Sequence, residues 1–102
     1  MEFDNLYNVF IATYKDYLSV KQFEEIKLCT REIIEADAEA RRAKKSELIL
    51  SIAKLRQKLE VFECTYSLIK EKCGSSDEVD QYINSIKREI DDLLRKKTSH
   101  HF

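Results

Sequence analysis

The stretch LILSIAKLRQKLEVFECTYSLIKEKC, residues 48–73, decides the fold of this chain. Its apolar side chains recur at alternating gaps of four and three, which places one continuous seam along an α-helix packed on other helices. The seam consists of Leu48, Ile52, Leu55, Leu59, Phe62, Tyr66, Ile69 and Cys73. We therefore expect a helix over about residues 47–73.

The same stretch carries a second, shorter strip on the opposite side of the expected helix. At 100° per residue, Leu50, Val61 and Leu68 lie roughly 200–220° from Leu48. A helix at the edge of a small bundle needs only one apolar face, so the second face predicts a partner. We expect an oligomer interface formed by Leu50, Gln57, Val61, Cys64 and Leu68.

Two helices are expected before this stretch. The first covers about residues 3–18, and its aromatic stripe should face the core: Phe3, Tyr7, Phe10, Tyr14 and Tyr17. Ser19 and Gln22 spell a capping box, in which each side chain bonds the backbone of the other end of the first turn. The second helix should then run over about residues 20–44.

Residues 35–47 leave two structures open. They contain neither Gly nor Pro, so one continuous helix of about 50 residues is conceivable. We favour a turn, because the apolar ladder slips to a gap of five between Ala43 and Leu48. Lys44 and Lys45 also suit a helix C-terminus, and Ser46 suits the next N-cap.

A fourth helix follows Gly74, the only glycine, which is well placed for a left-handed C-cap. Ser75 and Glu78 spell a second capping box. The apolar face of this helix is formed by Val79, Tyr82, Ile83, Ile86, Ile90, Leu93 and Leu94. Short connections make neighbouring helices antiparallel, so we expect an all-α, up-down-up-down four-helix bundle over residues 1–97, self-associating through its third helix, and a flexible tail over 98–102.

Composition excludes several classes of function. The chain has 102 residues, 36% of them charged, and no proline, as suits one small helical domain. Its two histidines, His100 and His101, lie in the expected tail, and no Glu-x-x-His motif, glycine-rich phosphate loop or catalytic triad pattern is present. We expect no enzyme activity, cofactor, metal site or membrane span, three free cysteines, and a cytoplasmic location.

The net charge is only −1, but basic residues should gather at one end of the bundle. That end and its extension along the third helix comprise Arg41, Arg42, Lys44, Lys45, Lys54, Arg56, Lys58, Arg95, Lys96 and Lys97. Basic residues at helix C-termini also compensate the helix dipole, and that explanation stays open. The alternative is an electropositive surface that contacts the phosphates of RNA or DNA.

Three stretches resemble a known family: LYNVFIATYKDYL (6–18), IKLCTREIIEADAEARRAKK (26–45) and ELILSIAKLRQKLEVFECTYSLIKEKCGSSDEVDQYINSIKREIDDLLR (47–95). They are similar to the small four-helix bundles that include the accessory variability determinant (Avd) of diversity-generating retroelements and the proteins encoded in ribosomal-RNA intervening sequences. The resemblance implies a five-fold assembly that binds a reverse transcriptase and its RNA. It implies no catalytic residues.

Two hypotheses follow from the sequence. The first is a non-enzymatic, self-associating bundle that assists a reverse transcriptase or another nucleic-acid enzyme by binding protein and RNA or DNA. The alternative is a structural coiled-coil adaptor subunit that contacts no nucleic acid.

Overall fold

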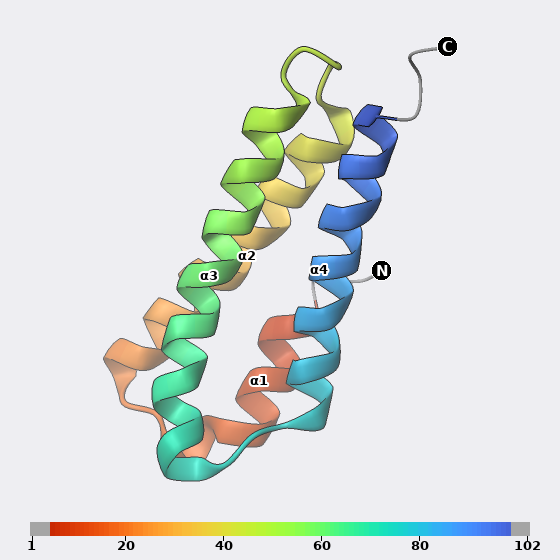
Figure 1. Ribbon diagram of the computed structural model, residues 1–102. Coiled ribbons are helices and arrows are strands. Elements are labelled where there is room, and N and C mark those ends of the chain that lie inside the picture. The colour runs from red at the N-terminus through yellow and green to blue at the C-terminus, as the bar shows by residue number, and fades with distance from the viewer. Residues whose placement is uncertain (1–4, 99–102) are drawn as a thin grey trace.

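The computed structural model describes the backbone of residues 5–98 and the side chains of residues 5–95. This part of the chain consists of helices joined by short connections (Figure 1). The helices are α1 (Asn5–Tyr14), which continues into a 3-10 turn (Lys15–Tyr17), α2 (Val20–Arg42), α3 (Leu48–Cys73) and α4 (Asp77–Thr98). Residues 5–98 contain no strand, so the all-α, four-helix prediction is confirmed.

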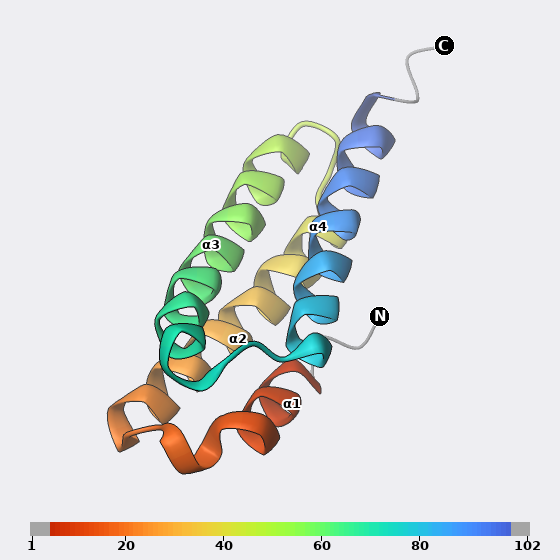
Figure 2. The ribbon, with the colours of Figure 1, turned by 60° about the horizontal axis from the view of Figure 1, so that its bottom comes forward.

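Consecutive helices run in opposite directions, which gives the up-down-up-down arrangement (Figures 1 and 2). The α2–α3 turn and the C-terminal end of α4 lie at one end of the bundle, and the α3–α4 connection lies at the other. With 10 residues, α1 is much shorter than α2, which has 23. It packs near the α3–α4 connection, so among the described residues the end with the α2–α3 turn is formed by α2, α3 and α4 (Figure 1).

The seam of α3 forms the centre of the core, as the sequence predicted. Leu55 and Phe62 have no exposed surface, and Leu59 and Tyr66 are almost as buried. Phe10 of α1 contacts Phe62 and Tyr66 edge-on, with ring centroids 5.7 and 5.9 Å away. Fully burying each such side chain stabilises the fold by roughly 1.5–3 kcal/mol, so this aromatic cluster fixes α1 on α3.

Several predicted helix boundaries are confirmed. The amide of Gln22 donates to Ser19 Oγ, and the amide of Ser19 donates to Gln22 Oε1, so the capping box forms. Gly74 ends α3 with a φ of 84°, which a residue without Cβ adopts readily. α2 ends at Arg42 and α3 begins at Leu48, so residues 43–47 turn the chain and the single long helix is excluded.

Two predicted caps are wrong. Ser46 does not cap α3, because Glu47 occupies the N-cap position and makes no side-chain cap bond. The expected box of Ser75 and Glu78 does not form either, because α4 begins at Asp77. Ser76 caps this helix instead, and its Oγ accepts a hydrogen bond from the amide of Val79 at 3.3 Å.

The aromatic stripe is only partly buried. Phe10 and Tyr14 lie in the core and Tyr7 at its edge, but Tyr17 is 66% exposed. The chain tightens into a 3-10 turn after Tyr14, and three residues per turn carry Tyr17 off the stripe. At the other end, α4 continues to Thr98, one residue beyond the expected domain limit. Phe3 and residues 99–102, including both histidines, lie outside the described residues.

Candidate interaction surfaces

The second strip of α3 faces away from the core. Leu50 is 75% exposed, Leu68 is 66% exposed and Val61 is 48% exposed. Gln57 and Cys64, the two remaining positions, are exposed as well. Single exposed apolar residues are common on soluble proteins, but a row of them along one helix is typical of an interaction surface. We call these five residues the outer strip of α3.

Leu28 extends the outer strip onto α2, which the sequence analysis did not anticipate. This side chain is 54% exposed. It lies one turn before Glu32, and Val61 lies nearly one turn after Lys58. Since Glu32 and Lys58 pair across the boundary of these antiparallel helices, Leu28 and Val61 flank the same level of the bundle. The apolar surface is therefore shared by two helices.

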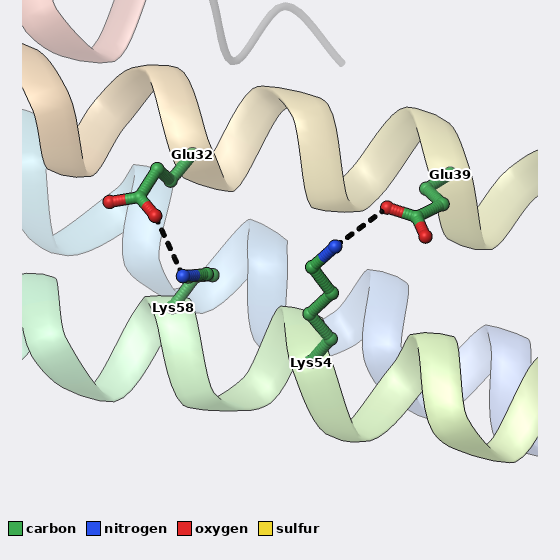
Figure 3. Close-up of polar contacts among 4 residues, drawn as sticks. All are labelled: Glu32, Glu39, Lys54 and Lys58. Carbon is green, nitrogen blue, oxygen red and sulfur yellow. Dashed lines mark hydrogen bonds and ion pairs between the residues drawn. The ribbon is translucent and has the colours of Figure 1, made fainter.

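Two lysines of α3 that were expected to contact nucleic acid form ion pairs within the chain (Figure 3). Lys58 Nζ lies 2.7 Å from a carboxylate oxygen of Glu32, and Lys54 Nζ lies 3.1 Å from one of Glu39. The four side chains line a shallow groove of about 310 Å³ between α2 and α3. The glutamates offset both lysine charges, so this part of α3 is not a strongly basic surface.

Arg41 is also engaged within the chain. Its guanidinium lies 2.6 Å from Glu89 on α4 and 3.2 Å from Asp37, one turn earlier on α2. The Asp37 side chain is only 10% exposed, and its Oδ1 has no hydrogen-bond partner among the described residues. Burial raises the pKa of Asp37, while Arg41 acts in the opposite direction. Arg41 thus compensates a buried carboxylate and ties α2 to α4.

The rest of the predicted basic surface is divided between two places. Arg42, Lys44 and Lys45 are exposed at the α2–α3 turn, without an ion pair among the described side chains. Arg56 lies elsewhere, in a groove of about 420 Å³ between α3 and α4 that acidic residues also line. Arg95 lies 3.6 Å from Asp92 on α4. The backbone of Lys96 and Lys97 is at the same end as the α2–α3 turn, and their side chains lie outside the described ones (Figure 1).

Metal binding and thiol chemistry would depend on His, Cys, Asp and Glu side chains. No group of three His, Cys, Asp or Glu side chains within residues 5–95 could hold a metal ion. Cys29, Cys64 and Cys73 are free thiols, and burial raises the pKa of Cys29, which makes it a poorer nucleophile. None of the described helices is both long and apolar enough to cross a membrane.

Comparisons with known proteins add no assignment. No protein-family model matches the chain, and no match is found among the curated proteins or the solved structures.

Proposed function

We propose that this chain is a non-catalytic interaction subunit that self-associates in the cytoplasm through the outer strip of α3. The observation that carries the proposal is the alignment of Leu50, Val61 and Leu68 on the solvent face of one helix. Leu50 and Leu68 lie 18 positions apart in the sequence, or about 27 Å along the helix at 1.5 Å per residue. That length suits lateral pairing with another helix better than it suits a small ligand.

The energetics favour a partner for this surface. Fully burying an exposed Leu or Val contributes roughly 1.5–3 kcal/mol, so three such residues in each of two copies offer a substantial driving force. Association itself costs an estimated 4–15 kcal/mol, which that driving force can offset. The ion pairs of Lys54 and Lys58 with α2 reduce the charge beside the strip, and hence reduce repulsion between copies.

A second candidate function is assistance to a nucleic-acid enzyme such as a reverse transcriptase. What supports it is the electropositive α2–α3 turn with Arg42, Lys44 and Lys45, close to the end of α4 that carries Arg95, Lys96 and Lys97 (Figure 1). A turn and helix ends offer charge but no element that fits a groove. RNA or DNA would therefore be held by its phosphates, without base recognition.

The experiment compares two double variants that each place two glutamates on exposed apolar positions. Leu50→Glu with Leu68→Glu charges the outer strip, whereas Tyr17→Glu with Val20→Glu charges the α1–α2 connection, where these residues are 66% and 80% exposed. We expect the first variant to run as a monomer with unchanged helical circular dichroism, and the second to keep the wild-type mass. If the strip variant keeps the wild-type mass, α3 is not the interface.

A further inference from the structure

We infer that α1 is a strap that opens as one unit while α2, α3 and α4 stay folded together. The sequence of α1 is NLYNVFIATY, which contains no charged residue, so this helix forms no side-chain ion pair with the rest of the bundle. With 10 residues it is also shorter than the about 12–15 residues that an isolated helix needs in water. α1 is therefore helical only while its apolar face is docked.

The other three helices are connected to one another without α1. Arg41 of α2 pairs with Glu89 of α4 at 2.6 Å, and Lys87 of α4 pairs with Glu63 of α3 at 3.2 Å. The two lysine–glutamate pairs of Figure 3 connect α3 to α2. Each of the three helices thus has a polar contact with both of the others.

The end of the bundle with the α2–α3 turn also has apolar contacts of its own. α1 packs at the opposite end, beside the α3–α4 connection (Figures 1 and 2). Near the turn, side chains from α2, α3 and α4 are at most 6% exposed: Ala40, Leu48, Ile52 and Leu93. Ile52 lies ten positions before Phe62 on α3, or about 15 Å along the helix from the residue that Phe10 of α1 contacts. This part of the core remains packed when α1 leaves.

The connection between α1 and α2 allows α1 to move without disturbing α2. The chain leaves α1 through the 3-10 turn (Lys15–Tyr17), and Leu18 is extended, with φ −102° and ψ 138°. α2 then begins at its own capping box, in which Ser19 and Gln22 bond each other's backbone amides. Both members of the box belong to residues 19–22, so the box stays intact when α1 opens.

A cluster of aromatic rings holds α1 in place. Phe10 and Tyr14 are buried, and Tyr14 Oη donates a hydrogen bond of 2.7 Å to the carbonyl of Gly74. The ring of Phe10 lies 5.7 Å from that of Phe62 and 5.9 Å from that of Tyr66, both on α3. Opening breaks these contacts together and exposes the rings of Phe62 and Tyr66. The closed strap therefore conceals an aromatic surface.

The contact between α1 and α4 resists opening less. A groove of about 280 Å³ separates the outer edges of these two helices, and polar side chains line much of it, among them Asn8 and Thr13 of α1 and Glu78 of α4. Polar groups in an open groove are already hydrated, so they lose little when the two helices part.

Native-state amide hydrogen exchange tests whether α1 opens separately, because each amide exchanges through the opening that breaks its own hydrogen bond. The paired probes are the amides of Phe10 on α1 and Phe62 on α3, whose side chains both have no exposed surface. The variant is Ile52→Ala in the full chain, which leaves a cavity at the end of the core away from α1.

A separate opening of α1 leaves the core around Ile52 folded, so Ile52→Ala should not change the exchange rate of the Phe10 amide. Exchange of the Phe62 amide should rise by at least about tenfold, because that amide exchanges when the three-helix core unfolds. If Ile52→Ala does not fold, Ile52→Val provides the same comparison, with a rise at Phe62 of about two- to tenfold. A rise at Phe10 equal to that at Phe62 would overturn the inference, because α1 would then open only when the whole chain unfolds.

Discussion

The ammonium of Lys58 lies 2.7 Å from the carboxylate of Glu32, across the boundary between α3 and α2. The pair has two consequences for function. It removes one positive charge from the surface that the sequence suggested for nucleic acid, and it flanks the outer strip with a neutral, ordered edge. The same holds for Lys54 and Glu39, two turns further along α2. Lys54 and Lys58 thus connect α3 to α2. The lysines of the α2–α3 turn, Lys44 and Lys45, are exposed instead.

Nucleic-acid binding at the basic end should follow this separation. Replacing Arg42, Lys44 and Lys45 with Gln should strongly weaken binding to structured RNA, because these side chains are exposed at the turn. Replacing Lys54 and Lys58 with Gln should weaken binding far less. Fluorescence anisotropy at about 50 and 200 mM salt measures the effect, since phosphate contacts weaken steeply over that range. If the wild-type protein binds no RNA at the lower salt, the basic residues at this end serve only to compensate the helix dipoles.

Arg41 and Arg42 are adjacent in sequence but should differ sharply in their effect on stability. Arg41→Gln leaves the buried carboxylate of Asp37 without its cation, which we expect to cost roughly 1–3 kcal/mol at pH 7. Arg42→Gln, at an exposed site, should change the free energy of unfolding by less than about 0.5 kcal/mol. Urea denaturation of both variants checks the difference.

The difference in stability between Arg41→Gln and Arg42→Gln should depend on pH. Burial raises the pKa of Asp37 above its unfolded value, so the fold favours the protonated carboxyl, and its contribution to stability is lost as pH rises through the folded pKa. A neutral carboxyl needs no cation. The gap between Arg41→Gln and Arg42→Gln should therefore shrink as pH falls through that pKa. A gap that widens toward acid would contradict the assignment.

The two core tyrosines provide a second matched pair. Tyr66 Oη accepts a hydrogen bond of 2.8 Å from the amide of Ser76, which is buried. Tyr14 Oη donates one of 2.7 Å to the carbonyl of Gly74, an exposed residue. Tyr66→Phe strands a buried donor and should cost roughly 1–3 kcal/mol. Tyr14→Phe should cost less, because water can replace the lost partner. Equal losses in thermal denaturation would place the two hydroxyls in equivalent surroundings.

The seam of α3 can be tested at neighbouring positions. Phe62 has no exposed surface, so Phe62→Ala leaves a cavity and should cost about 3–5 kcal/mol. Glu63 makes an exposed ion pair with Lys87 at 3.2 Å, and Glu63→Ala should cost at most about 1 kcal/mol. The melting temperatures of the two variants decide the matter. Similar temperatures would mean that Phe62 does not lie at the centre of the core.

The sequence predicted the features that depend on a single helix. The burial of Leu55 and Phe62 follows from their spacing alone, and the Ser19–Gln22 box is a local motif. The sequence could not predict that Lys54 and Lys58 pair with glutamates, because this pairing depends on the axial register of α2 against α3. The burial of Asp37 had no signal in the apolar pattern either. Tyr17 was misplaced because spacing gives no warning that a helix tightens into a 3-10 turn.

The mass of the protein in solution tests the central claim most directly. Multi-angle light scattering at about 100 μM should give a multiple of the 12.1 kDa chain mass, since association with a Kd near 1 μM would be nearly complete there. The mass of the Leu50→Glu/Leu68→Glu variant under the same conditions should fall to that of one chain. A wild-type mass of 12.1 kDa at this concentration would contradict self-association through α3.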